Sequence, residues 1–260
     1  MKYFSVADAR QMRGLRLVLT AHLPGPWSES AKAIFNARNV AYIAVEQVAG
    51  GANEELCTWT GGIRNAPVAM LDDDPPTHGW LDLAMMAERL GSGPSLLPEQ
   101  SADRALALGL SAEICAPHGF GWARRLLMFE TSYGPKDMSD ESPAHVRTML
   151  LQYGFSDAAV TAARARLIDI MGTLAGQLRA QRERGSRYMI GNRPSTIDFH
   201  WACFSQMVAP LPVEHQPAMP EWLIEKYSDL DPEVAKSLDP VLIEHRDFIY
   251  RNHIGLPLEF

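Results

Sequence analysis

The chain has 260 residues, 47% of them hydrophobic, so it can bury a sizeable core without disulfide bonds or metal ions. Its formal net charge of -7 gives no basic surface for a phosphate backbone, which argues against a nucleic-acid partner. No apolar run approaches the roughly 18 residues that span a bilayer, and the first residues lack the apolar core of a secretory signal. We therefore expect a cytoplasmic globular protein with no membrane partner.

The cysteine content favours a reducing compartment. The chain has three cysteines, Cys57, Cys115 and Cys203, which are odd in number and far apart in sequence. No zinc-binding pattern can be built from them, so we expect no metal. Their sequence neighbours include no group that would activate a thiolate, which predicts buried, inert thiols.

Strand and helix signals alternate over the first 90 residues. Residues 15–20 form a short apolar run between turn residues, as a buried strand does, and apolar residues then recur at helical spacing over 28–38. A second strand is predicted within 40–48 and a third over 66–71, with a proline near its start. A helix with one apolar stripe follows to residue 90. The order is β-α-β, then strand and helix.

Beyond residue 100 the pattern is helical. Residues 91–100 are rich in glycine, proline and serine without a period, which indicates a linker. Helices are predicted over 101–114, 122–130, 158–184, 195–208, 221–226 and 240–250. The chain therefore divides into an α/β unit over 1–90, a linker over 91–100 and an all-helical part over 101–260.

A capping motif begins the predicted helix at 195. Ser195 can accept from the N–H of Asp198, and the Asp198 carboxylate can return to the N–H of Ser195, which is a capping box with a short acidic side chain. We assign this pair a structural role. His200 and Trp201, which follow it in an apolar helix, are expected to be satisfied core residues.

Four segments, in this order of elements, resemble the cytosolic glutathione transferases up to about residue 208. They are "GPWSESAK" at a strand-to-helix junction, "NAPVAML" at a proline strand, "LLPEQSADRALAL" at the linker and "YMIGNRPSTIDFHWACF" at the capping motif. The resemblance implies the glutathione transferase fold, with an amino-terminal thioredoxin-like α/β domain and an all-α carboxyl-terminal domain. It also implies glutathione as co-substrate and assembly into a homodimer.

The resemblance places the thiol of glutathione at the junction that contains Trp27 and Ser28. A helix amino terminus with a nearby donor stabilises a thiolate. The family's principal hydroxyl or thiol donor aligns with Gly25, which has no side chain. The remaining candidates are the Ser28 hydroxyl as catalytic group, the main-chain N–H groups of Trp27 and Ser28, and His22. Ser28 is alternatively only the N-cap of the helix.

The resemblance also places the rest of the ligand. A cis Pro67 would leave the main chain of Ala66 free to pair with the cysteinyl part of glutathione. The γ-glutamyl end falls near Asp82 and Leu83, counted back from the end of that helix.

An apolar second substrate would lie against an aromatic group in the helical part. His118, Trp122 and Tyr133 line this predicted pocket, although such a cluster is also typical of a core. Arg124 and Arg125 nearby are consistent with a solvated face or an anion site.

The favoured function is a glutathione transferase that conjugates the thiolate to a hydrophobic electrophile. One alternative is a binding or assembly protein of this fold without thiol chemistry, which Gly25 and Leu83 support. Another is a glutathione-dependent isomerase or ether-cleaving enzyme.

Overall fold

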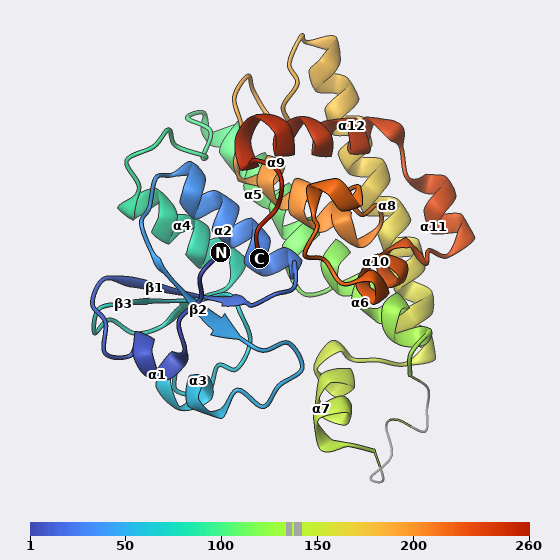
Figure 1. Ribbon diagram of the computed structural model, residues 1–260. Helices are drawn as coiled ribbons and strands as arrows, with labels where there is room; N and C mark the ends of the chain where they lie inside the picture. The colour runs from blue at the N-terminus through green and yellow to red at the C-terminus, as the bar shows by residue number, and fades with distance from the viewer. Residues whose placement is uncertain (134–136, 138–141) are drawn as a thin grey trace.

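The computed structural model describes residues 1–133, 137 and 142–260, and its amino-terminal part contains one mixed sheet (Figure 1). The strands are β1 (Leu15–Thr20), β2 (Ile43–Gln47), β3 (Val68–Leu71) and β4 (Thr77–His78). β1 pairs in parallel with β2 and antiparallel with β3, and β3 pairs antiparallel with β4, which gives the order β2-β1-β3-β4.

Helices cover both faces of this sheet. Helices α2 (Pro26–Ala37) and α4 (Trp80–Leu90) lie on the face towards the helical part, and α1 (Val6–Ala9) and α3 (Glu54–Trp59) lie on the other face (Figure 1). Side chains alternate along β1, so that Leu17 packs with α2 and α4 whereas Val18 packs with α1 and α3. Because both faces are buried, the apolar residues of β1 do not alternate strictly with polar ones, and even Arg16 is 3% exposed.

The helical part surrounds α9, which is buried along its whole length. α9 packs against α2 of the sheet unit and against α5 and α12 of the helical part, so it joins the two (Figure 1). The helices are α5 (Ser101–Cys115), α6 (Phe120–Glu130), α7 (Ala144–Tyr153), α8 (Asp157–Glu183), α9 (Thr196–Phe204), α10 (Glu221–Ser228), α11 (Pro232–Ser237) and α12 (Pro240–Ile249). Short helical turns at Ser205–Met207, Val213–His215 and Tyr250–Ile254 complete it.

The predicted architecture is confirmed: a mixed sheet with helices is followed by a part that is helical in all its described elements. The predicted bounds of β1 are those observed, and six helices, α2, α5, α6, α8, α10 and α12, lie within two residues of their predicted ranges. The sequence analysis missed α1, α7, α11 and β4, and it expected at most one helical turn where α3 lies. Among the described helices, none has the length and apolarity needed to cross a membrane.

The capping motif at the start of α9 is confirmed, and it is larger than predicted. The carboxylate of Asp198 is fully buried and accepts from the Ser195 N–H at 2.7 Å and from the Ser195 hydroxyl at 2.9 Å. Its other oxygen accepts from the Met189 N–H at 2.8 Å and lies 3.0 Å from Nε2 of His245 on α12. One carboxylate therefore ties the start of α9 to the preceding loop and to α12.

A buried ion pair lies on α2. Glu29 and Lys32 are 5% and 7% exposed, and the Lys32 ammonium is 2.8 Å from Oε1 of Glu29. The same ammonium donates to the carbonyl of Glu259 at 2.6 Å, next to the buried side chain of Phe260. Burial raises the pKa of Glu29, and the charge of Lys32 opposes that rise. The carboxyl-terminal segment thus completes the hydrogen bonding of a lysine in the sheet unit.

Replacement of Asp198 tests the capping motif. Asp198→Ala leaves the N–H groups of Ser195 and Met189 buried without an acceptor, which we expect to lower the free energy of unfolding by about 2–4 kcal/mol. Urea unfolding followed by circular dichroism measures this change. The exposed Glu183→Ala serves as control and should stay within about 0.5 kcal/mol of the wild type. An Asp198→Ala protein as stable as the control would contradict the assigned role.

Removal of the Lys32 charge tests the ion pair. Lys32→Met leaves a buried carboxylate without its partner, so we expect a loss of about 3–5 kcal/mol at neutral pH. The folded-state pKa of Glu29 then rises further above its unfolded value of 4.5, and the group binds a proton more readily in the folded state. The variant should therefore regain stability relative to wild type as the pH falls from 7 towards about 5.

Two further proteins complete this experiment. In the double variant Glu29→Gln with Lys32→Met, most of the loss should disappear because no charge is left unpaired. Lys236→Met, at an exposed position, should change stability by less than about 0.5 kcal/mol. Equal losses for Lys32→Met at pH 5 and 7 would show that the pair is not the cause.

Candidate functional site

The junction between β1 and α2 places main-chain N–H groups at a helix start. Gly25 is the N-cap of α2 and Pro26 is its first residue, where the missing N–H of proline costs no hydrogen bond. The first intrahelical bond runs from Glu29 N–H to the Gly25 carbonyl at 2.9 Å. The N–H groups of Trp27 and Ser28 precede it and belong to the unpaired end of the helix. The expectation that Ser28 is the N-cap is wrong.

The side chain of Ser28 is used within the fold. Ser28 is 1% exposed. Its hydroxyl accepts from the Thr20 N–H at 3.0 Å and lies 3.2 Å from Thr20 Oγ1. A Cβ at Gly25 would also meet Thr20 Oγ1, at 3.2 Å. Both positions therefore face the end of β1, and the junction offers main-chain groups rather than a free hydroxyl.

The main chain before β3 has the predicted form. The Ala66–Pro67 peptide bond is cis, as expected. None of the hydrogen bonds that the described residues make outside helices and strands engages the N–H or C=O of Ala66. Ala66 is half-buried, and its N–H and C=O can still form hydrogen bonds.

The start of α4 lies one turn earlier than the sequence count placed it. Gly79, with a φ of 90°, is its N-cap and Trp80 is its first residue. Asp82 is exposed within the first turn, whereas Leu83 is 1% exposed and packs in the core under the sheet. The residues at the helix start are therefore Gly79 and Trp80, with Asp82 in the first turn and Leu83 turned into the core.

A narrow crevice brings several predicted residues together between the sheet unit and the helical part. Its volume is about 10 Å³, which is the space of one water molecule, so the crevice itself does not admit a peptide. The walls come from α2, α4, α9 and the loop before β3. They are Trp27, Ser30, Ala31, Ile34, Pro67, Trp80, Leu83, Ala84 and His200.

His200 is the polar side chain on the α9 wall of this crevice. It is 1% exposed, its Nδ1 has no hydrogen-bond partner, and its ring stands edge-on to Trp80 with centroids 5.6 Å apart. Burial lowers the pKa of His200 to about 3, so the imidazole is neutral. The sequence predicts that His200 and Trp201 are core residues with their polar atoms hydrogen-bonded. This prediction is wrong for Nδ1 of His200. It is confirmed for Trp201, whose indole donates to the Leu242 carbonyl at 3.0 Å.

The aromatic residues predicted for the second substrate form one connected cluster. Trp122 contacts Tyr153 of α7 at 4.3 Å between centroids and His118 at 6.3 Å. Phe129 joins Tyr153 to Tyr133, at 5.2 and 5.9 Å. The sequence analysis missed Tyr153 because it did not predict α7.

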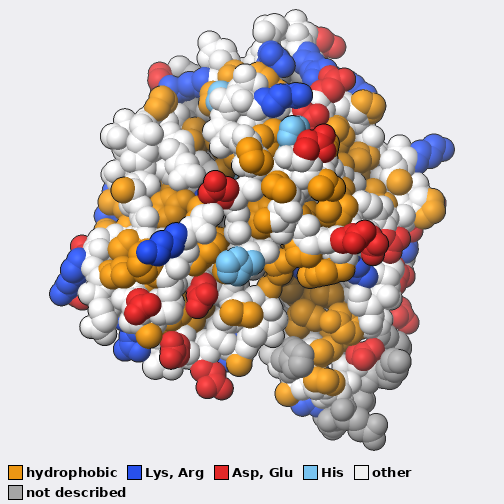
Figure 2. Space-filling view, in the orientation of Figure 1, with side chains coloured by type: hydrophobic (Ala, Val, Ile, Leu, Met, Phe, Trp, Pro, Cys, Tyr) orange, Lys and Arg blue, Asp and Glu red, His pale blue; other side chains and the backbone are white. Residues whose placement is uncertain are grey.

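The start of α6 lies next to the start of α2. A Cβ at Gly121 would come within 2.8 Å of the Trp27 ring, so the beginning of α6 packs directly on that indole. The Trp27 Nε1 donates to the Cys115 carbonyl at 2.9 Å. Figure 2 shows hydrophobic side chains gathered in a hollow beside α7, on the side of the helical part that faces the sheet unit.

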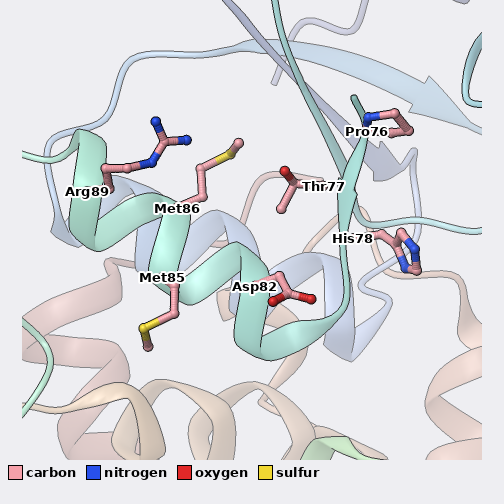
Figure 3. Close-up of a pocket in the computed structure, with 7 residues that line it drawn as sticks. All are labelled: Pro76, Thr77, His78, Asp82, Met85, Met86 and Arg89. Atoms are coloured by element: carbon pink, nitrogen blue, oxygen red, sulfur yellow. The ribbon is translucent and has the colours of Figure 1, made fainter. Parts of the chain in front are cut away.

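A larger recess of about 430 Å³ lies elsewhere, between β4 and α4. Figure 3 shows Asp82 and His78 near one end of it and Arg89 at the other, with two methionines of α4 between. It shares only Asp82 with the predicted site. Its lining residues are Pro76, Thr77, His78, Asp82, Met85, Met86 and Arg89.

The remaining candidate groups have structural roles. Arg124 is 2% exposed and donates to main-chain carbonyls, including those of Met207 and Asp229 at 2.8 Å each, so the expected solvated face is wrong for this residue. Burial raises the pKa of both the Cys115 and the Cys203 thiols, which keeps them protonated and unreactive. In the part of the chain that the structure describes, no three histidine, cysteine or acidic side chains meet as a metal site would require.

No protein-family model matches the chain, and neither does any curated protein. Solved structures do. A glutathione S-transferase of Methylobacterium radiotolerans, in complex with glutathione sulfonate, is similar with a TM-score of 0.63 and 14% identity over 95% of this chain and 97% of that one. A glutathione S-transferase domain-containing protein of Marinobacter aquaeolei gives 0.60 and 13%, over 92% and 100% of the two chains.

The beta-etherase of a Sphingobium strain is also similar, with a TM-score of 0.54 and 13% identity over 86% of this chain and 98% of that one. At such identities the likeness concerns the fold rather than the chemistry. It extends over the sheet unit and the helical part together. The chain therefore has the glutathione transferase fold.

Proposed function

We propose that this protein binds glutathione at the junction of β1 and α2 and transfers its thiolate to an apolar electrophile. The observation that carries the proposal is the placement of two unpaired main-chain groups on neighbouring elements. The N–H and C=O of Ala66 are free beside Pro67, the N–H groups that begin α2 are free at Trp27, and Pro67 and Trp27 line the same crevice. An extended peptide can pair with the first set while its thiol approaches the second.

The thiol would be activated by the main chain. The thiol of glutathione is mostly protonated at neutral pH, and only the thiolate is a strong nucleophile. The unpaired N–H groups of Trp27 and Ser28, together with the positive end of the α2 dipole, favour the charged form. The proton leaves to solvent.

The γ-glutamyl end would lie at the start of α4. The N–H groups of its first turn are free to donate to a carboxylate, as helix amino termini commonly do. Asp82 is exposed in the same turn and carries the charge needed to meet the ligand's amino group.

The second substrate would lie against the aromatic cluster of α6 and α7. Trp122 and Tyr153 are half-buried rings on α6 and α7, and α6 begins against Trp27, so an apolar pocket there would favour a planar hydrophobic electrophile. The rate gain would come from proximity and thiol activation. An isomerase or ether-cleaving activity would use the same thiol site and differ in this pocket alone.

A binding protein without turnover is the second candidate. Three observations favour it: Gly25 offers no side-chain donor, the Ser28 hydroxyl is engaged by Thr20, and the crevice at Pro67 has a volume of only about 10 Å³. Such a protein would still bind the peptide through Ala66.

Titration with reduced glutathione tests the proposal. We expect saturable binding with a Kd on the order of 1 mM, or roughly 4 kcal/mol of binding free energy. Calorimetry measures it directly, and tryptophan emission should change because Trp27 and Trp80 line the site. The analogue with serine in place of cysteine should bind more weakly, because it has no thiolate for the helix end to stabilise.

The same titration separates the two candidates. Turnover of a chlorodinitrobenzene by the glutathione complex supports the transferase, whereas binding without turnover supports the binding protein. Absence of saturation up to about 10 mM would contradict both.

Replacement of Ser28 tests whether its hydroxyl acts on the sulfur. Ser28→Ala should lower the free energy of unfolding by about 1–2 kcal/mol, because the Thr20 N–H loses its acceptor, and should leave the affinity for glutathione unchanged. Thr20→Val removes the other side of the contact, so the two losses should be non-additive. A tenfold weaker affinity at unchanged stability would instead assign the hydroxyl to the ligand.

A further inference from the structure

The proposed thiol site has no obvious side-chain donor for sulfur. Gly25 has no side chain, and the Ser28 hydroxyl is held at the end of β1 by Thr20. His22, the other candidate at this junction, is exposed, and its ring lies against Tyr3 with centroids 5.6 Å apart. The main-chain N–H groups of α2 are then the donors that remain at the helix start. A polar side chain on the opposite wall would complete the coordination of a thiolate.

His200 occupies that wall. It lies on α9 and lines the same crevice as Trp27 and Pro67, and its Nδ1 is buried without a hydrogen-bond partner. Buried polar atoms are almost always paired, so an unpaired one at the meeting point of α2, α4 and α9 calls for a ligand. The crevice has room for about one heavy atom and no more, with a volume of about 10 Å³.

We propose that His200 donates a hydrogen bond to the sulfur of the bound thiol, in place of the side-chain donor that Gly25 and Ser28 do not provide. The inference rests on the proposed function, because the sulfur belongs to the ligand bound at Ala66 and α2. It makes His200 a residue that touches the substrate.

The protonation state of His200 suits a donor. The residues that line the crevice with it on α2, on α4 and at Pro67 carry no titratable group. Burial alone lowers the pKa of His200 to about 3, so the ring is neutral and keeps one N–H throughout the neutral range. It does not take up the thiol proton, which leaves to solvent.

Entry of the sulfur requires one wall of the crevice to move. The Trp27 indole is anchored to the Cys115 carbonyl at 2.9 Å. Trp80 is half-buried at the first residue of α4, and its ring stands edge-on to His200. Because the Trp27 indole is held by this hydrogen bond, Trp80 is the wall whose side chain would have to turn away to admit the sulfur.

Two substitutions at His200 test the inference. His200→Leu removes the donor, and His200→Asn retains an N–H donor in a smaller side chain. We expect the pKa of the bound thiol, measured by the ultraviolet absorbance of the thiolate, to rise by about one unit in His200→Leu, a tenfold loss of thiolate at a given pH. His200→Asn should restore part of it.

Thermal unfolding provides the readout that a structural role would not give. Because His200→Leu replaces an unpaired buried polar atom by an apolar group, its melting temperature should equal or exceed that of the wild type. Thr196→Val is the matched control. It removes another unpaired buried hydroxyl from α9, outside the crevice lining, and should leave the thiol pKa unchanged.

The outcomes separate this inference from the proposed function. If glutathione binds to neither wild type nor His200→Leu, both are overturned. If it binds to both proteins with the same thiol pKa, the role of His200 alone is overturned. A His200→Leu protein that melts well below the wild type would show a purely structural residue.

Discussion

The burial of α9 is the constraint on which the rest of the structure depends. A helix that is buried along its length cannot leave its first N–H groups to water, so its start must be capped from within the protein. Asp198 does this and also reaches the loop at Met189 and His245 of α12. The sheet unit packs on α9 through α2, so the position of the candidate site relative to the aromatic cluster follows from this one anchored helix.

Helix α2 combines two demands that usually conflict. Its amino terminus must stay unpaired if it is to bind an anion, while its first turn also carries the buried carboxylate of Glu29. Gly25 and Pro26 begin the helix without a capping side chain, and Lys32, about one turn after Glu29, neutralises that carboxylate. The positive end of the helix dipole is therefore left for a ligand.

The sequence predicts those elements whose signals are local and strong. β1 and the cap at Ser195 and Asp198 depend on neighbouring residues, and both predictions are confirmed. The start of α4 is less predictable because Gly79 serves as N-cap through its backbone conformation, with no side-chain signal. The Ser28 hydroxyl could bond either to its own helix or to β1, and its bond to the Thr20 N–H depends on how α2 packs on the sheet. The lack of a hydrogen-bond partner for Nδ1 of His200 likewise depends on which side chains α2 and α4 place around it.

The bond from Lys32 to the carbonyl of Glu259 joins residues 227 positions apart. During synthesis Lys32 leaves the ribosome long before Glu259, so its ammonium can at first bond only to Glu29. Long-range contacts of this kind slow folding because a large loop has to close first. The second hydrogen bond of the Lys32 ammonium can therefore form only after the carboxyl-terminal segment has been made.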